Sequence, residues 1–247
     1  MRTYATAQLI GDRSHQCDAT AVHTAPSGAR AYVLLDGIGS TDEIRDWTRN
    51  AARRLARAAA RRGDAEAGLR AVYDRYAAAP ERQGPWAYEP EACAVVAVAA
   101  PGRPLTVAWC GDSRAYLLAD GAAQRLTQDH NLRRVYPPTD VFPEGGNRHR
   151  ITSCLGSAYT DDEVKGACGH PAIESVTRPA ENCRLLLASD GAYEPYEDGG
   201  HDLSAYLTGT PGPAARRFVA TAVDIARAAP NPHADNATVL IADIRSS

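Results

Sequence analysis

Acidic residues at the ends of apolar runs set the strongest constraint on this chain. The run YVLLDG ends in Asp36-Gly37, the run RLLLASDG ends in Asp190-Gly191, and Asp235-Asn236 stands directly before ATVLIADI. Short apolar runs of this kind are typical of buried strands. Carboxylates that follow strands far apart in sequence meet only through folding, and converging like charges repel each other unless a cation lies between them. The pattern therefore predicts a site for a hard divalent metal.

A simpler interpretation exists for each pair taken alone. An Asp-Gly pair after an apolar run is more often a hairpin turn than a metal ligand. We assign that role to Asp120-Gly121, because strand-like sequence resumes directly after it. A hairpin fits poorly at Asp36-Gly37, which leads into a helical pattern, and at Asp190-Gly191, which leads into the polar stretch AYEPYEDGGHD. For Asp235 in isolation, a turn aspartate is an equally good interpretation.

Length and charge limit the class of protein. The chain has 247 residues, of which 44% are hydrophobic, and its net charge is −3. This fits one globular domain over residues 1–247 with a sizeable core. Interspersed acidic and basic residues imply no nucleic-acid or membrane-surface partner. The N-terminal stretch lacks the apolar segment of a signal peptide, and no later run is long enough to span a bilayer, so we expect a cytoplasmic monomer.

Cysteine spacing argues against a soft-metal or redox site. No two of the six cysteines form a C-x-x-C pair, which a zinc or dithiol site would usually show. Several lie within apolar runs, where a thiol behaves as a small hydrophobic side chain. We therefore expect reduced core thiols at most of Cys17, Cys93, Cys110, Cys154, Cys168 and Cys183.

Residue periodicity predicts helices in two separate blocks among many strands. Apolar residues from Ile44 to Ala58 recur at steps of three and four, which indicates an amphipathic helix, and Ser40 with Glu43 has the capping-box spacing at its start. Further helices are expected at about 65–79 and 213–228. This arrangement favours the α+β class over alternating βαβ units. Strands are expected at about 3–10, 19–24, 29–35, 92–99, 105–110, 114–118, 172–177, 183–188 and 238–244, with a short one ending near Leu126.

The segment 130–150 shows no regular periodicity. It contains Pro137-Pro138, Pro143 and Gly145-Gly146 and is about as long as a structureless connection within a compact domain becomes. Such loops are usually functional or mobile.

Seven short motifs occur in a fixed order along the chain, and together they are more specific than any one of them. The motifs are Arg13 with Asp18-Ala19, DGIG from Asp36, GDSRAY from Gly111, LTQDH from Leu126, Ile151-Thr152 with Leu155-Gly156, SDG from Ser189, and DNATV from Asp235. The series closely resembles the PPM family of metal-dependent Ser/Thr protein phosphatases, the phosphatase 2C type. The resemblance extends from about Arg13 to Ile244. It implies a four-layer α-β-β-α sandwich with two central antiparallel sheets and metals at one end.

The resemblance also implies roles for individual acidic residues. Asp36 resembles the carboxylate that bridges two divalent ions, and the carbonyl of Gly37 resembles a further ligand. Asp190 and Asp235 resemble the remaining direct ligands. Asp18 resembles the acidic residue at the metal site that holds ligands or bound water.

Three other positions take their expected roles from the same resemblance. Arg13 stands where the family places its phosphate-binding arginine. Asp112 stands where bacterial members bind a third, weaker metal together with the equivalent of Asp190. The loop at about 130–150 resembles the flap beside the active site.

The chemistry of these residue types agrees with that expectation. Oxygen ligands suit Mn²⁺ or Mg²⁺ rather than softer metals. Two such ions can acidify a shared water and clamp phosphoryl oxygens, while an arginine adds a fork of donors matched to phosphate. The implied activity is hydrolysis of phosphoserine or phosphothreonine in phosphorylated proteins, by direct attack of hydroxide activated at a binuclear Mn/Mg centre.

The chain departs from the family pattern at three places. Cys17 replaces the acidic or amide residue that usually precedes the first aspartate, so the second metal is expected to rely more on water. Ile38 stands where eukaryotic relatives often carry a histidine that is a candidate general acid, so leaving-group protonation is expected to fall to bound water if no other acid substitutes. In the flap, two interpretations remain open, contact with an acidic phosphosubstrate or a solvated basic loop, for Arg133, Arg134, Arg148, His149 and Arg150.

Two other functions remain open from the sequence. A degenerate member of the family would bind phosphoproteins and turn over poorly, and only Cys17 and the unusual flap favour it. A relative that acts on a small phosphorylated metabolite would use the same residues. Both alternatives share the expected fold.

Overall fold

Two five-stranded antiparallel sheets form the centre of the molecule. The computed structural model describes residues 3–82, 89–119, 121–179 and 182–245. The first sheet has the strand order β1-β10-β9-β6-β7, and the second has the order β2-β3-β4-β5-β8. The first contains β1 (Tyr4–Leu9), β10 (Ala237–Ile244), β9 (Cys183–Ala188), β6 (Arg114–Ala119) and β7 (Ala122–Arg125). The second contains β2 (Ala19–Thr24), β3 (Arg30–Gly37), β4 (Ala92–Ala99), β5 (Leu105–Cys110) and β8 (Glu174–Arg178).

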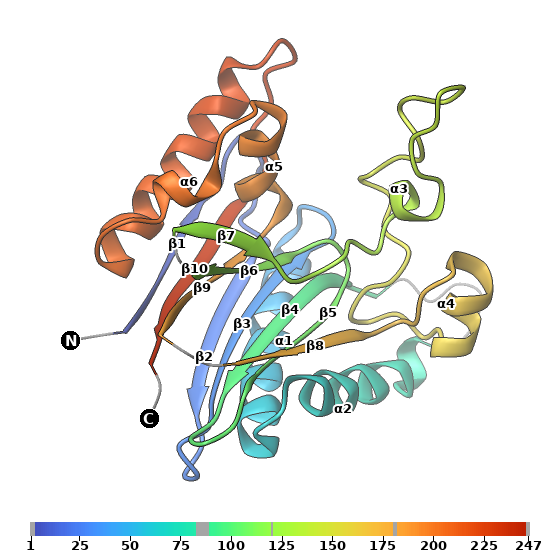
Figure 1. Cartoon of the computed structure of the whole chain (residues 1–247). Helices are drawn as coiled ribbons and strands as arrows, with labels where there is room; N and C mark the ends of the chain where they lie inside the picture. The colour runs from blue at the N-terminus through green and yellow to red at the C-terminus, as the bar shows by residue number, and fades with distance from the viewer. Residues whose placement is uncertain (1–2, 83–88, 120, 180–181, 246–247) are drawn as a thin grey trace.

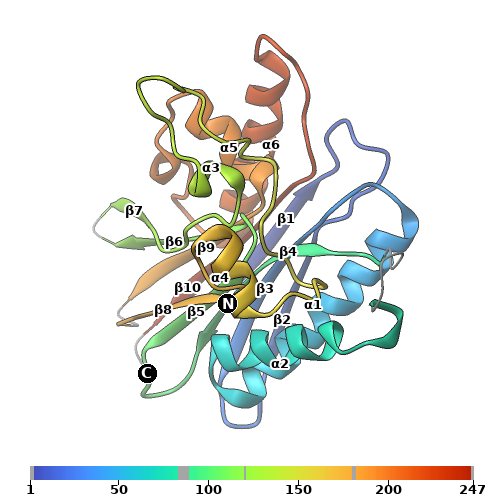
Figure 2. The ribbon, with the colours of Figure 1, turned by 90° about the vertical axis from the view of Figure 1, so that its right-hand side faces the viewer.

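Helices cover the outer faces of both sheets. The helices α5 (Asp190–Asp198) and α6 (Pro211–Ala228) lie outside the first sheet, and α1 (Asp42–Arg62) and α2 (Ala65–Ala77) lie outside the second (Figure 1, Figure 2). This confirms the four-layer α-β-β-α sandwich expected from the motifs. The shorter helical segments are η1 (Pro80–Arg82), α3 (Leu132–Val135), α4 (Asp161–Cys168) and η2 (Leu203–Tyr206).

Strand β3 shows why the sandwich needs long apolar runs. Leu34 faces the other sheet and joins the central core, whereas Val33 and Leu35 face α1 and join an outer core. Successive side chains of a strand alternate between its two faces, and both faces of this strand are buried. A strand buried on both sides therefore has no position for a polar residue until Asp36, at the end of the sheet.

The start of α1 differs by one residue from the expected cap. The N-cap is Thr41, whose side-chain oxygen accepts a hydrogen bond from the backbone N–H of Ile44 at 3.2 Å. The prediction that Ser40 caps this helix is therefore wrong. Ser40 instead lies 2.9 Å from the hydroxyl of Ser14 and accepts from the N–H of His15. Ser40 and Thr41 both carry a hydroxyl, so the sequence alone offers two equivalent candidates for the N-cap.

Two helices of eight or more residues were not expected. α5 starts at Asp190 and contains Pro195, a residue that normally disfavours helix interiors, so its pattern looked irregular. Ala192, Tyr193 and Tyr196 bury its apolar face. α4 is only eight residues long and depends on a capping box between Thr160 and Glu163.

The hairpin predicted between β6 and β7 is present. Ala119 pairs with Ala122, and Gly121 has a φ of +81°, which suits a tight turn. Asp120 itself lies outside the described residues. All six cysteines are free and all but Cys168 are buried, which confirms the expectation of reduced core thiols for most of them.

Candidate metal centre

The five candidate aspartates come from both sheets and meet at one end of the sandwich. Asp18 precedes β2 and Asp36 lies in β3, whereas Asp112 lies in the turn between β5 and β6. Asp190 begins α5 directly after β9, and Asp235 precedes β10. A cavity of about 210 Å³ forms there, and its lining includes Arg13, Asp36, Gly37, Asp112, Asp190 and Asp235.

Hydrogen bonds between β9 and β10 place two of these carboxylates side by side. The N–H of Thr238 donates to the hydroxyl of Ser189 at 3.0 Å, and the N–H of Ser189 donates to the carbonyl of Thr238 at 3.1 Å. Asp190, directly after Ser189, and Asp235, three residues before Thr238, are therefore held near each other. A Cβ at Gly191 would lie 2.4 Å from the carbonyl oxygen of Asn236, so only glycine allows this approach.

Asn236 links the loop of Asp235 to the segment of Asp18. Its Oδ1 accepts a hydrogen bond from the N–H of Cys17 at 2.8 Å, and its Nδ2 donates to the carbonyl of Ile10 at 2.9 Å. Both partners lie in the chain that leads into β2. The asparagine of the Asp-Asn pair is therefore a positioning residue for two candidate ligands at once.

The remaining candidates are fixed by packing against their neighbours. Gly37 is buried, and a Cβ there would lie 2.6 Å from the carbonyl oxygen of Cys17 and 2.7 Å from the hydroxyl of Thr48. The hydroxyl of Tyr193, on α5, donates to the carbonyl of Asp112 at 3.1 Å. This bond ties the turn between β5 and β6 to the helix that carries Asp190.

Burial and mutual repulsion make the carboxylates unusually weak acids. Asp18 is only 2% exposed, and burial together with the charge of Asp190 raises its pKa to about 8. Asp112 behaves alike, with burial and Asp190 raising its pKa to about 8. Burial and Asp18 raise the pKa of Asp36 well above its ordinary value. Each shift reflects the cost of placing negative charge where water is scarce and other carboxylates are near.

The two side-chain oxygens of Asp18 provide the test of whether a metal fits. Both are buried, and neither has a hydrogen-bond partner of good geometry among the described residues, although the nearby hydroxyls of Thr238 and Ser189 act to lower the pKa of Asp18. A buried polar atom without a partner is costly, and a carboxylate more so. The charges of Asp190 and Asp235 also act on Asp18, so further carboxylate oxygens lie near it. A hard divalent cation satisfies these oxygens, so the residues present fit Mn²⁺ or Mg²⁺.

Arg13 is the nearest permanent cation to this cluster. Its Nε donates to Oδ1 of Asp235 at 2.7 Å, and a second nitrogen of the guanidinium donates to Oδ2. The hydrogen bond to Asp235 raises the pKa of Arg13 above its usual value, and the charges of Asp190 and Asp36 act in the same direction. The guanidinium therefore stays charged at the edge of the cavity, where an anionic ligand would meet it.

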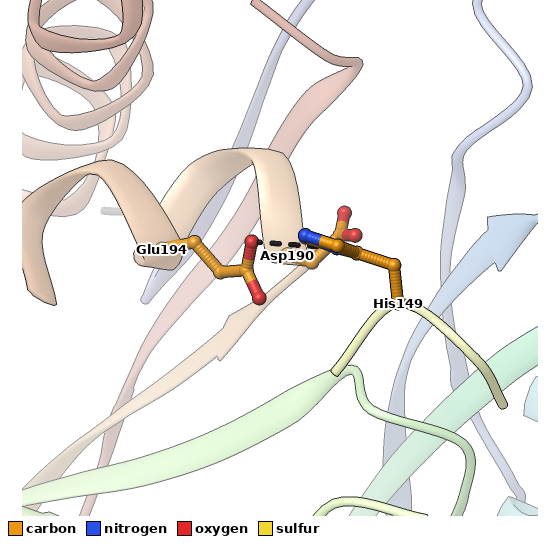
Figure 3. A group of neighbouring side chains, drawn as sticks. All are labelled: His149, Asp190 and Glu194. Carbon is orange, nitrogen blue, oxygen red and sulfur yellow. Dashed lines mark ion pairs between the residues drawn. The ribbon is translucent and has the colours of Figure 1, made fainter. Parts of the chain in front are cut away.

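His149 and Glu194 lie at the site although they were not assigned to it from the sequence. Nitrogen or oxygen atoms of His149, Asp190 and Glu194 all lie within 4.8 Å of one another, with the histidine reaching from the flap toward α5 (Figure 3). Nδ1 of His149 is 3.8 Å from Oε2 of Glu194. Burial and Asp190 raise the pKa of Glu194 to about 8. Glu194 lies four residues after Asp190, so a prediction of helix α5 from the sequence would have placed both residues on one helix face.

Two of the flap arginines, Arg134 and Arg148, are paired with carboxylates of the protein. Arg134 donates two hydrogen bonds to Glu174, at 2.6 and 3.0 Å. Arg148 donates two to Asp198, at 2.7 and 2.6 Å. The flap is therefore fastened to the body of the molecule at both points. This ordering contradicts the picture of a wholly solvated loop at these two residues.

Cys17 takes no part in the cavity. Its side chain is fully buried, and its Sγ lies 3.6 Å from the carbonyl oxygen of Thr41 at the start of α1. Burial raises the pKa of this thiol. A second thiol, that of Cys93, does line the cavity, and burial raises its pKa well above the usual value. Neither thiol is ionised near neutral pH, so neither acts as a nucleophile.

Comparison with known proteins finds similarity to one group of phosphatases. The model of the family described as protein phosphatase 2C matches residues 35–135. The serine/threonine protein phosphatase PstP of Mycobacterium tuberculosis is 27% identical over 151 residues, which are 61% of this chain and 27% of PstP. These matches support a relationship between this chain and the PPM family of phosphatases.

Solved structures of PPM proteins share the whole fold. The PPM Ser-Thr phosphatase MsPP of Mycobacterium smegmatis, in complex with cacodylate, has a TM-score of 0.66 and 22% identity, covering 98% of this chain and 97% of MsPP. The catalytic domain of PstP, in complex with two manganese ions, has a TM-score of 0.62 and 22% identity, with 98% of both chains covered.

Curated PPM relatives are longer than the region they share with this chain. The human probable protein phosphatase 1N is 28% identical over 186 residues, which are 68% of this chain but 43% of that protein. The chain thus matches about a quarter to a half of the length of these relatives. Within the described residues, no helix combines the length and apolarity that a membrane crossing requires.

Proposed function

We propose that this chain is a metal-dependent protein phosphatase that hydrolyses phosphoserine and phosphothreonine. The observation that carries the proposal is the pair of buried, unpartnered oxygens of Asp18 amid converging carboxylates. In a structural ion pair, buried carboxylate oxygens have hydrogen-bond donors beside them. In a cation site, such oxygens are left for the bound ion to contact. We also propose that residues 1–247 act as one catalytic unit.

The ligands of two Mn²⁺ or Mg²⁺ ions would come from the aspartate cluster. Asp36 would bridge the ions, Asp190 and Asp235 would complete the direct carboxylate ligands, and Gly37 would contribute its carbonyl oxygen. Asp18 would hold the other ligands or bound water in place. A third, weaker ion would use Asp112 together with Asp190. Ions held there would supply the positive charge that acidifies water and neutralises phosphoryl oxygens.

The remaining chemistry belongs to the protein's own side chains. Arg13 would bind the phosphoryl oxygens, because its planar fork of donors lies at the cavity edge and matches the geometry of phosphate. Asn236 and Ser189 would hold the carboxylates in register, since their hydrogen bonds join the segments that carry them. Transfer of a phosphoryl group makes little covalent demand on the protein, so such positioning would account for most of the rate.

The relatives support the same activity. Curated members with detectable similarity are named protein phosphatases, and the catalytic domain of PstP was solved with two manganese ions. Phosphorylated proteins are the substrate class that those names indicate. The motif resemblance assigns the direct carboxylate ligands to Asp36, Asp190 and Asp235, and the presence of all three in this chain disfavours a catalytically weak binding module.

Purified protein with p-nitrophenyl phosphate tests the proposal directly. We expect hydrolysis that requires Mn²⁺ or Mg²⁺ and stops in excess chelator. Phosphoserine and phosphothreonine peptides, compared with sugar and nucleotide phosphates, then test the substrate class. Binding of phosphopeptides without any metal-dependent turnover would indicate the regulatory module instead, and a preference for a small phosphorylated metabolite would contradict the protein substrate.

A further inference from the structure

A second cavity runs directly out of the candidate metal centre. It has a volume of about 840 Å³ and shares His149, Asp190 and Asp235 with the smaller cavity of about 210 Å³. Ligand sites in proteins typically occupy about 300–1,000 Å³. The smaller cavity has room for a phosphoryl group and its ions, whereas the larger one, called here the α5–α6 groove, offers room for whatever that phosphoryl group is attached to.

The two walls of the α5–α6 groove differ in chemistry. One wall is the side of α5 that faces the groove, where Asp190, Glu194 and Asp198 follow one another at the four-residue spacing of a single helix face. The opposite wall comes from the end of α6 and the residues after it, and it presents small apolar side chains. These include Ile225, Ala226, Ala228, Ala229 and Pro230.

The length of the acidic wall matches a short stretch of extended polypeptide. From Asp190 to Asp198 the helix rises by about 12 Å, at 1.5 Å per residue. An extended chain covers that distance with about three or four residues, at about 3.3–3.6 Å each. A phosphorylated metabolite would leave most of this groove empty, whereas the residues beside a phosphoserine in a protein would occupy it.

The charges along the groove set the residues that it would accept. Arg148 is the arginine of the lining, and it is already bound by two carboxylates of α5, at 3.2 Å to Glu194 and 2.6 Å to Asp198. Among the described residues, no free guanidinium in the lining remains for an acidic side chain, because the two carboxylates of Glu194 and Asp198 already face the single charge of Arg148. The apolar wall of α6 would instead contact an aliphatic side chain.

We propose that the α5–α6 groove binds the polypeptide on one side of the phosphorylated residue and selects an aliphatic side chain over an acidic one within about three positions of it. This inference rests on the proposed phosphatase activity. It adds to that activity a preference in the substrate sequence and names the surface responsible.

Matched phosphoserine peptides test the preference. Peptides with Ala, Leu or Asp at the second and third positions on either side would be compared by kcat/KM at pH 8 with Mn²⁺, and p-nitrophenyl phosphate would serve as the reference substrate. On one side of the phosphoserine, kcat/KM should be roughly three- to tenfold higher for the Leu peptide than for the Ala peptide, because partial burial of an aliphatic side chain contributes that much. The value for the Ala peptide should in turn be roughly three- to tenfold higher than that for the Asp peptide. Equal rates for all three residues on both sides would overturn the proposal.

Two arginine variants on one helix locate the effect. Ala228→Arg adds a long cationic side chain to the apolar wall, whereas Ala220→Arg adds the same charge to an exposed position of α6 outside the groove lining. Ala228→Arg should lower the ratio of Leu-peptide to p-nitrophenyl phosphate activity by roughly three- to tenfold and reverse the penalty against Asp. Ala220→Arg should leave the ratio as in the wild type. The same change in both variants would contradict the assignment to this groove.

The failures of the two proposals are distinguishable. If the wild-type protein hydrolyses neither p-nitrophenyl phosphate nor any phosphopeptide, the proposed phosphatase activity is wrong. If it hydrolyses p-nitrophenyl phosphate but shows no peptide preference, only the proposed role of the groove is wrong. If Ala228→Arg does not fold, Ala229→Arg provides the same test, because Ala229 is exposed, lines the groove and lies beyond the last turn of α6.

Discussion

Arg13 and Asp235 form a two-point ion pair at the edge of the aspartate cluster, with Nε of the arginine 2.7 Å from Oδ1 of the aspartate. The side chains are 39% and 32% exposed, so water screens much of their attraction. An ion pair at this level of exposure contributes about 0–1 kcal/mol to stability. The pair matters more for placing the guanidinium, because its planar group is held facing a cavity where phosphate would bind.

Replacing the guanidinium of Arg13 by a single ammonium group tests whether this residue binds phosphate. Arg13→Lys keeps the charge but loses the paired donors that match phosphate. We expect kcat/KM for p-nitrophenyl phosphate to fall by about tenfold or more, mainly through a higher KM, while the free energy of unfolding changes by less than about 1 kcal/mol. Steady-state kinetics and urea titration measure the two quantities. Unchanged KM would remove Arg13 from phosphate binding.

Removing one carboxylate from the cluster should stabilise the metal-free protein while it destroys activity. In Asp36→Asn, the repulsion from Asp18 and its neighbours is relieved, and Tm in chelator should rise by at least about 2 °C. Activity with Mn²⁺ should fall by at least about a hundredfold, because the variant lacks a proposed metal ligand. Asp224→Asn, an exposed change of the same charge on α6, is the control. A lower Tm for Asp36→Asn would contradict the electrostatic account.

Asn236 should affect metal affinity without being a ligand. Asn236→Ala leaves the N–H of Cys17 and the carbonyl of Ile10 without partners, at a cost of about 1–3 kcal/mol in the free energy of unfolding. Affinity for Mn²⁺, measured by calorimetry, should fall by about 10–100-fold because supporting residues orient the ligands. Asn236→Asp keeps only the acceptor for Cys17, so its affinity for Mn²⁺ should lie between those of the wild type and the alanine variant. Wild-type affinity in the alanine variant would argue against this role.

His130 should give the protein an acid-sensitive stability. It is fully buried and stacks on His170, with ring centroids 4.1 Å apart, and burial lowers its pKa from 6.5 to about 4. Below pH 6.5 the unfolded chain binds a proton that the folded chain still excludes. Stability therefore falls as pH drops from about 6.5 to 4, by up to about 3 kcal/mol in total.

Urea titrations at pH 7.5 and 5.0 measure this dependence. His130→Asn should show a smaller loss of stability between the two pH values than the wild type, even if it is less stable at both. An equal loss in both proteins would mean that other groups cause the acid sensitivity.

The nature of the leaving group should strongly affect the rate. Ile38 is 40% exposed and lines the cavity, and it has no proton to donate. His149 lines the same cavity, but its two ring nitrogens face Glu194 and the Nε of Arg148. We expect rates that rise steeply as the leaving-group pKa falls across a series of phenyl and alkyl phosphates, with the same slope in His149→Gln. A steeper slope in that variant would identify His149 as the acid.

The sequence predicted the layers and the converging aspartates because those features follow from local patterns. Apolar runs such as that of β3 are strands buried on both faces, and an aspartate at the end of such a run must lie at the end of a sheet. The α5 helix was missed because Pro195 hides its pattern, and Glu194 was missed with it. The place of His149 depends on ion pairs between the flap and α5, such as Arg148 with Asp198, and no periodicity encodes contacts of that kind.

The candidate centre draws Asp36 from one sheet and Asp190 and Asp235 from the borders of strands in the other. In chelator, repulsion among the carboxylates at this end opposes the packing of the two halves of the sandwich, which the apolar layer and the hydrogen bonds of Asn236 hold together. Divalent ions would reverse the sign of that force and act as a fastening across the halves. The supply of manganese or magnesium would then govern the protein's mechanical cohesion and its resistance to proteolysis along with its turnover.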